Sequence, residues 1–185
     1  MSSFPAHPGG EAQTLRFLSL AEQLGTLPSG CRILDLGAGD GTTVRLLRER
    51  GFEIVGLDLK PAGEGVLKGD LLHTGFPDAS FDCVISECAF WRSGDQRTAI
   101  SEAGRILKPG GCLLLADVFF EDPDLPGFRI LSREDRTPAW REYYLSALWL
   151  EDLPEDLFGC GCAPAKGNCR YWMLIAKKED RNGSV

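Results

Sequence analysis

The feature that most constrains this sequence is a glycine-rich turn between an apolar run and a helical pattern. Residues 31–36 form a short, mostly apolar run, typical of a strand that is buried on both faces of a sheet. Gly37, Gly39 and Gly41 follow, and residues 42–50 then place apolar side chains at helical spacing. Glycine allows both a sharp backbone turn and the close approach of a ligand. The segment therefore predicts a strand, a ligand-binding turn and a helix.

Strand-like and helix-like segments alternate along the rest of the chain. A second strand is expected at 52–57, and the helix that connects it to the first implies parallel strands with a right-handed crossover. Further strands are expected at 81–86, 112–118 and 170–177, and further helices at 14–24, 95–107 and 137–150. Residues 60–68 are rich in glycine and hold at most a fragment of helix. The alternation predicts one doubly wound α/β domain with a mostly parallel sheet.

Three aspartates stand at or near the ends of predicted strands, where doubly wound sheets bind ligands. Asp35 precedes the first glycine of the turn by two residues, and a carboxylate there suits a cationic amino-acid head group better than a phosphate. Asp58 ends the second strand, where an acid accepts hydrogen bonds from a ribose diol. Asp70 precedes another turn. Its carboxylate would either bind a ligand or simply cap that turn. The glycine spacing is not that of the dinucleotide fingerprint, which argues against a nicotinamide enzyme.

Together these motifs resemble the class I S-adenosylmethionine-dependent methyltransferases, and most of all the branch labelled methyltransferase type 11. The resemblance rests on residues 33–41, 55–58, 69–70, 81–82 and 105–111, and it spans roughly residues 30–118. It implies a Rossmann-like sheet of seven strands whose last strand, at 170–177, is antiparallel. It also implies S-adenosylmethionine as the cofactor and methyl transfer as the activity.

The resemblance assigns cofactor-binding roles to the residues at matching positions. They are Asp35, Gly37, Ala38 and Gly39 around the methionine part, Asp58 at the ribose hydroxyls, and Leu59, Asp70 and Leu71 around the adenine. The segment between Asp58 and Asp70 has 11 residues, fewer than the family's usual helix and strand require. An open adenine side is therefore expected.

Ser86 and Glu87, at the end of the strand expected at 81–86, would border the methyl group and its acceptor. Glu87 is the candidate general base. A hydroxyl acceptor benefits from such a base, whereas a thiolate or metalloid acceptor can react without one. A contact from Glu87 to the cofactor amine or to another side chain is the alternative. The strand end lacks the motif of enzymes that methylate amino groups of nucleic acids, and the net charge is −7. Both observations favour a small-molecule acceptor over a nucleic acid.

The cysteines allow a second interpretation. Cys160, Cys162 and Cys169 lie just before the last strand, and Cys88 lies at the open end of the sheet. Cys160, Cys162 and Cys169 would suit a thiolate site whose fourth ligand is Cys88, a histidine or a partner chain, and together with Cys88 they would suit a methyltransferase for thiols or metalloids. Their spacing matches no common zinc site, and small buried cysteines in a hairpin are the alternative.

The expected organisation is an N-terminal lid of residues 1–28 and an S-adenosylmethionine-binding domain of residues 29–185, with acceptor walls from 119–169. His7 would fold over the cofactor or belong to a flexible end. The chain shows no secretory signal and no apolar run of about 18–20 residues, so a cytoplasmic enzyme with no membrane partner is expected. A binding protein that keeps the cofactor site without catalysis is a further alternative, and the oligomeric state is left open.

Overall fold

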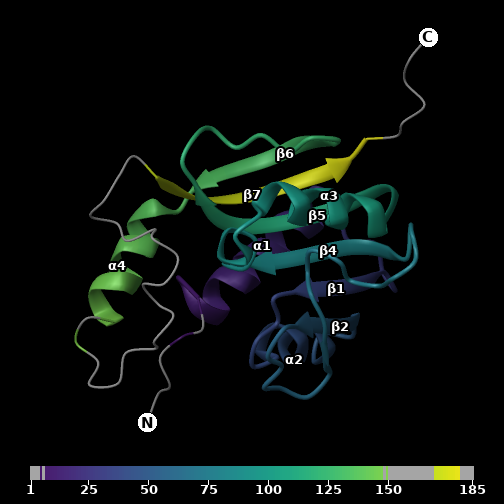
Figure 1. The fold of residues 1–185 in the computed structure, drawn as a ribbon, viewed down its shortest axis with the longest axis horizontal. Helices are drawn as coiled ribbons and strands as arrows, with labels where there is room; N and C mark the ends of the chain where they lie inside the picture. Colours follow the sequence, from purple (N-terminus) through teal and green to yellow (C-terminus); the bar gives the residue numbers. More distant parts are fainter. Residues whose placement is uncertain (1–4, 6, 148, 150–168, 180–185) are drawn as a thin grey trace.

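The computed structural model describes residues 5, 7–147, 149 and 169–179. At its centre is a sheet of seven strands in the order β3-β2-β1-β4-β5-β7-β6 (Figure 1). The strands are β1 Arg32–Leu36, β2 Glu53–Asp58, β3 Val66–Lys68, β4 Phe81–Glu87, β5 Leu107–Phe119, β6 Phe128–Asp135 and β7 Arg170–Lys178. The helices are α1 Gly10–Gln23, α2 Thr42–Arg48, the short 3-10 helix η1 Trp91–Ser93, α3 Gln96–Ile106 and α4 Thr137–Ala147.

The order of the strands places the ligand-binding edge of the sheet. Strand β1 pairs in parallel with β2 on one side and with β4 on the other. The chain leaves β1 toward β2 and later returns to β4, so the connections diverge at the carboxyl ends of β1 and β4. Open α/β sheets bind ligands at this switch point. Strand β7 is antiparallel to both β5 and β6, so the predicted fold, with its antiparallel last strand, is confirmed.

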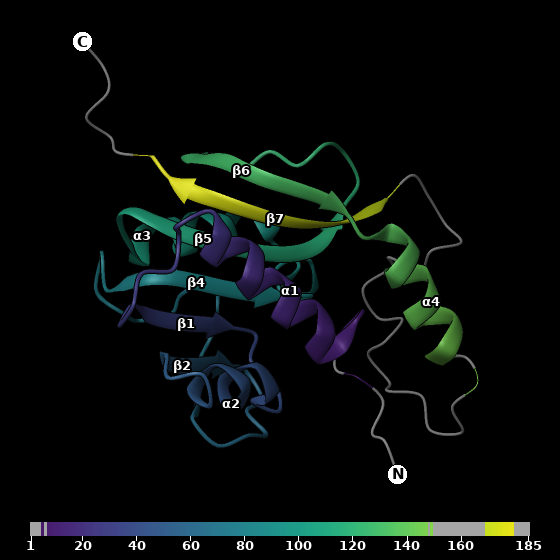
Figure 2. The same cartoon turned by 180° about the vertical axis from the view of Figure 1, so that it is seen from behind.

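Both faces of the sheet are covered, as strands this apolar require. On one face, Phe17 of α1, Val44 of α2 and Trp140 of α4 pack with strand residues such as Ile33. On the other face, α3 packs against the neighbouring residue Leu34, because successive strand side chains point to opposite faces. Figure 2 shows α1 in front of the sheet, with α3 behind it. Within the described part of the chain, no helix has the length and hydropathy to span a membrane.

Strands β3 and β6 have no clear pattern in the sequence. They form the two edges of the sheet, and each pairs with one neighbour. Most of their residues are exposed or half-buried, so neither strand carries the apolar run by which β1 and β4 are recognised. The short segment after β2 contains β3 and no helix, in agreement with the expected lack of room. Helix α1 begins four residues earlier than its apolar stripe predicts, at Gly10.

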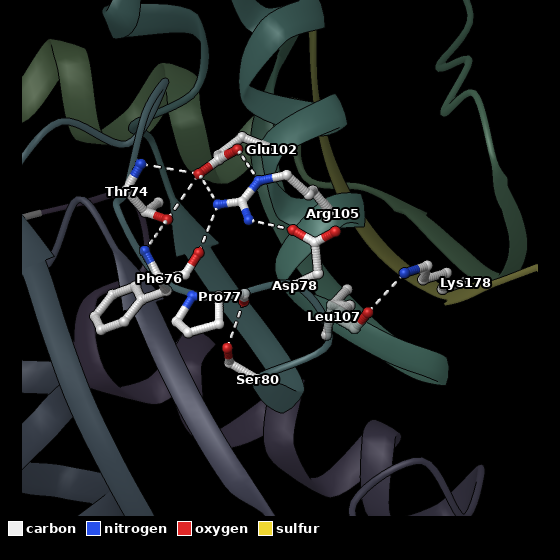
Figure 3. Close-up of polar contacts among 9 residues, drawn as sticks. All are labelled: Thr74, Phe76, Pro77, Asp78, Ser80, Glu102, Arg105, Leu107 and Lys178. Carbon is white, nitrogen blue, oxygen red and sulfur yellow. Dashed lines mark hydrogen bonds and ion pairs between the residues drawn. The ribbon is translucent and has the colours of Figure 1, made fainter.

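A polar network fixes the loop that leads into β4 (Figure 3). Arg105 of α3 donates to both carboxylate oxygens of Glu102 at 2.8 Å, to Asp78 at 2.6 Å and to the Phe76 carbonyl at 2.8 Å. Thr74 donates to Glu102 through its backbone amide at 2.8 Å and its hydroxyl at 2.7 Å. The Arg105 guanidinium, with help from Thr74, lowers the pKa of Glu102 to about 2. The ionised carboxylate is therefore the centre of this network.

We expect Glu102→Gln to lower the free energy of unfolding by about 1–3 kcal/mol near pH 7, because Arg105 and Thr74 lose a charged acceptor. The pKa of Glu102 is lower in the folded protein than its ordinary 4.5, so the stabilisation is complete above 4.5 and disappears as the pH falls toward 2. Urea unfolding near pH 7 and near pH 3 measures this, and the difference between wild type and variant should shrink at the lower pH.

Glu53→Gln is the matched control, because Glu53 forms an exposed ion pair with Arg32 at 3.4 Å. Such pairs contribute little to stability. A Glu102→Gln variant as stable as the Glu53→Gln variant near pH 7 would contradict this account.

Candidate functional site

A cavity of about 510 Å³ opens at the carboxyl ends of β1, β2 and β4. Its wall contains nine of the ten residues that the sequence predicts to bind the cofactor or face the acceptor: Asp35, Gly37, Ala38, Gly39, Asp58, Leu59, Asp70, Leu71 and Glu87. Residues from four separate parts of the chain thus meet at the switch point of the sheet. Their contacts with a bound cofactor remain predictions.

The glycine turn forms the floor of this cavity. Gly37, Gly39 and Gly41 have φ angles of 85°, 48° and 75°, which residues with a side chain rarely adopt. At Gly37 a Cβ atom would lie 2.1 Å from the Cβ of Ala89, so only glycine lets the turn pass beside the loop after β4. The Gly37 amide donates to the carbonyl of Leu57 at 2.8 Å, which joins the turn to β2.

Asp58 joins the turn to β2 through its side chain. One carboxylate oxygen accepts from the Gly39 amide at 2.9 Å and the other from the Lys60 amide at 2.8 Å. A carboxylate offers about four acceptor positions, so each oxygen can still accept from a ligand hydroxyl. The next residue, Leu59, is 60% exposed at the cavity rim and offers an apolar surface to a flat ring.

Asp70 both caps a turn and lines the cavity. Its Oδ1 accepts from the Leu72 amide at 2.8 Å, the capping role that the sequence left open. Leu71 beside it is buried. The segment that lacks a helix lies against the glycine turn, since the Ala62 amide donates to the Gly39 carbonyl at 3.0 Å. On this side the cavity is lined by Leu59, Lys60 and residues 69–72, and the place of the adenine there stays a prediction.

Asp35 is the most buried acid of the cavity wall, with 4% of its surface exposed. Burial, followed by the charges of Glu87, Asp58 and Asp40, raises the pKa of Asp35 well above its ordinary value. The described lining contains five carboxylates and two cationic side chains, Lys60 and Arg92. A cavity with this balance of charges favours a cationic ligand, which relieves the repulsion among the acids.

Ser86 does not line the cavity. It is fully buried, and its hydroxyl donates to the Leu36 carbonyl at 2.7 Å, which ties β4 to the end of β1. Because side chains alternate along a strand, Ser86 and Glu87 point to opposite faces of the sheet. The geometry therefore supports the predicted place beside the acceptor for Glu87 and does not support it for Ser86.

Glu87 contacts the N-terminal part of the chain. Thr14 of α1 donates through its hydroxyl to Oε2 at 2.7 Å, and Gln13 Nε2 lies 3.5 Å from Oε1. His7 lines the cavity, with Nε2 3.5 Å from Oε2. The sequence motifs did not indicate these three partners. A usable signal was present, because Gln13 and Thr14 continue the buried stripe of α1 with polar side chains.

The structure places two of the four cysteines on which the cysteine interpretation depends, Cys88 and Cys169. Burial and the charge of Asp117 raise the pKa of the Cys88 thiol far above its ordinary value, and Sγ donates to the Tyr171 hydroxyl at 3.2 Å. Cys169 is buried in the apolar core, whereas Cys160 and Cys162 lie outside the described residues. Among the residues that the structure describes, no three His, Cys, Asp or Glu side chains are placed to hold a metal ion.

A second cavity, of about 700 Å³, lies beside α3, the start of β6 and the end of β7. Three of its charged side chains, those of Asp78, Arg105 and Lys178, bind other groups of the protein, as Figure 3 shows. Arg105 binds Asp78 at 2.6 Å, and Lys178 donates to the Leu107 carbonyl at 2.6 Å. This cavity contains none of the predicted site residues.

Comparison with known proteins identifies similar sequences and folds. The demethylmenaquinone methyltransferase of Thermus thermophilus is 32% identical over 135 residues, which make up 64% of this chain and 60% of that protein. The chain spans less than two thirds of the length of the curated relatives to which it is at least 30% identical.

Solved structures share the fold at low sequence identity. One is phosphoethanolamine N-methyltransferase 2 of Haemonchus contortus in complex with S-adenosyl-L-methionine, with a TM-score of 0.67 at 20% identity. The match covers 97% of this chain and 55% of that chain. Another is the cyclase SpnF, with a TM-score of 0.65 at 20% identity. The match covers 96% of this chain and 84% of the SpnF chain.

The family model described as a methyltransferase domain matches residues 34–115. This range contains the glycine turn, Asp58, Asp70 and Glu87, and thus most of the cavity wall. Residues 34–115 therefore match a methyltransferase domain, which confirms the resemblance that the sequence motifs indicate.

Proposed function

We propose that this protein transfers a methyl group from S-adenosylmethionine to a small-molecule acceptor. The observation that carries the proposal is the cavity at the switch point, where Asp35, the glycine turn and Asp58 meet. The methyltransferase-domain match and the relatives named as methyltransferases support S-adenosylmethionine as the cofactor. In this proposal residues 1–28 form a lid and residues 29–185 the cofactor-binding domain.

The residues of the cavity wall fit this cofactor. S-adenosylmethionine carries positive charge on its sulfonium and ammonium groups, and five carboxylates line the cavity. Asp35 would pair with the ammonium group, and the backbone at Gly39, where a Cβ atom would meet no atom within 4 Å, would be open to close contact with the cofactor. Asp58 would accept hydrogen bonds from the ribose hydroxyls, and Leu59 and Leu71 would pack on the adenine. When bound, the cofactor supplies both the electrophilic methyl group and its own leaving group.

The chain's own task is then to orient the acceptor and to exclude water. Glu87, Cys88 and Arg92 line the part of the cavity beside β4, where the acceptor would enter. Demethylmenaquinone and phosphoethanolamine, named for the two methyltransferases above, are both small molecules. Together with the net charge of −7, these names support a small acceptor over a nucleic acid.

A second candidate function is cofactor binding without methyl transfer. The similarity to SpnF favours it, because SpnF has the same fold and is named as a cyclase, not as a methyltransferase. A methyltransferase for thiols or metalloids is less well supported, because the Cys88 thiol keeps its proton beside Tyr171.

Calorimetric titration with S-adenosylhomocysteine tests the cofactor site. We expect wild type to bind with micromolar affinity, and Asp58→Ala to bind at least about tenfold more weakly, which corresponds to about 1.4 kcal/mol. Asp122→Ala is the control, because Asp122 is exposed and pairs with Arg133 away from the cavity. Folded wild-type protein that does not bind S-adenosylhomocysteine would refute the proposed function.

Asp35→Asn should weaken binding and stabilise the ligand-free protein. The pKa of Asp35 is raised in the folded state, so its ionisation destabilises the fold as the pH rises above the ordinary value of 3.8. The neutral amide removes this penalty, and thermal unfolding near pH 7 should show a higher Tm for the variant. The affinity of wild type for S-adenosylhomocysteine should fall as the pH is lowered through the raised pKa of Asp35, because only the carboxylate pairs with the ammonium group.

The same pH series on Asp35→Asn provides the control, because the amide has no proton to gain and its affinity should depend less on pH. A variant that binds as tightly as wild type and melts at the same temperature would show that Asp35 neither strains the cavity nor meets the ligand.

A further inference from the structure

The two oxygens of the Glu87 carboxylate have different surroundings. Oε2 accepts from the Thr14 hydroxyl at 2.7 Å and lies 3.5 Å from His7 Nε2. Oε1 has one long contact, 3.5 Å, to Gln13 Nε2. The Glu87 side chain is 5% exposed and lies in the cavity wall. One oxygen is thus anchored, and the other keeps lone pairs for a group inside the cavity.

The groups that hold Glu87 come from a region that would otherwise be apolar. Gln13 and Thr14 are each 1% exposed, and they lie on the face of α1 that packs on the sheet with Phe17. Buried polar side chains cost stability unless they are hydrogen-bonded, and here their partners are Glu87 and the Tyr171 hydroxyl, which accepts from Gln13 at 3.2 Å. The N-terminal segment therefore fixes the position of one cavity carboxylate.

The other titratable groups around Glu87 are poorly suited to accept a proton. Burial raises the pKa of both Cys88 and Tyr171 well above ordinary values, so both keep their protons near neutral pH. The charges of Asp35, on β1, and Glu87 repel each other, and Asp35 would pair with the cofactor ammonium group. His7 approaches Glu87 through Nε2, while its Nδ1 faces the Pro8 carbonyl at 3.3 Å. Both ring nitrogens of His7 thus face oxygen atoms of the protein, so Oε1 of Glu87 is the best-placed proton acceptor among these groups.

We propose that Glu87 is the general base of the methyl transfer, and that Thr14 and His7 are the positioning residues that aim its carboxylate at the transferring methyl group. This inference rests on the proposed function. A lone pair of the acceptor atom forms the bond to the methyl carbon while the carbon–sulfur bond breaks and its electron pair returns to sulfur. The proton of the acceptor atom passes to Oε1 of Glu87. The acceptor is then a hydroxyl or amine compound, and not a thiolate or a metalloid.

Sinefungin and S-adenosylhomocysteine together test where Glu87 lies without any need for the acceptor. Sinefungin carries an ammonium-bearing carbon where the cofactor carries its methylated sulfur, whereas S-adenosylhomocysteine has a neutral sulfur there. Glu87→Gln should weaken sinefungin binding at least about tenfold and S-adenosylhomocysteine binding less than about threefold, because only the first ligand offers a charged donor. Equal losses for the two ligands would overturn the proposal.

Thr14 variants test the positioning role. Thr14→Val keeps the buried volume but removes the hydroxyl, and it should weaken sinefungin selectively by about threefold or more. Thr14→Ser retains the hydroxyl and should restore the wild-type ratio of the two affinities. Glu134→Gln is the control. Glu134, on β6, pairs at 2.8 Å with Arg16, which lies on α1 like Thr14, but Glu134 lies outside the cavity. A ratio that changes equally in Thr14→Val and Glu134→Gln would assign Thr14 a merely structural role.

The outcomes separate this inference from the proposed function. Wild type that binds neither ligand would refute the proposed function itself, whereas binding of both ligands with no selective loss in Glu87→Gln refutes only the role of Glu87. Transfer of labelled methyl groups to a mixture of phenols, hydroquinones and amino alcohols should be lost in Glu87→Gln. Transfer confined to dithiothreitol or arsenite, and unchanged in that variant, would also overturn the proposal.

Discussion

The close packing of Gly37 against Ala89 is the contact on which the rest of the site depends. It lets the turn after β1 pass beside the loop after β4, at the point where the sheet changes direction. Hydrogen bonds from the turn to Leu57 and Asp58 then fix it to β2. Three strand ends are thereby held around one cavity, and the side chains that follow each strand face a common space. Chemistry on this fold depends on such placement more than on any single side chain.

The second constraint is electrostatic. A cavity lined by five carboxylates, with Asp35 almost fully buried, is unfavourable for the protein alone. Strain of this kind concentrates at functional sites, where a ligand relieves it. Two buried polar residues of α1 belong to the same arrangement, because Thr14 and Gln13 contact the Glu87 carboxylate. The N-terminal helix thus contacts a side chain of the cavity wall.

The sequence predicts the centre of this structure better than its margins. Strands β1 and β4 are recognisable because both of their faces are buried, and the glycine turn is recognisable because its backbone excludes side chains. Edge strand β6 is half-exposed and carries no such pattern. Ser86 lies outside the cavity wall because a step of one residue along a strand moves a side chain to the other face, so the structure does not support its predicted place. His7 and Thr14 lie 80 and 73 positions from Glu87, so the buried polar stripe of α1 can indicate a site but cannot name this partner.

The most direct test of the central claim is a crystal structure of the protein with S-adenosylhomocysteine. The account predicts the ligand in the cavity at the carboxyl ends of β1, β2 and β4, with its ammonium group at Asp35, its ribose at Asp58 and its sulfur facing Glu87. A ligand bound instead in the cavity between Asp78 and Lys178, or crystals soaked at saturating concentration with the first cavity empty, would contradict it.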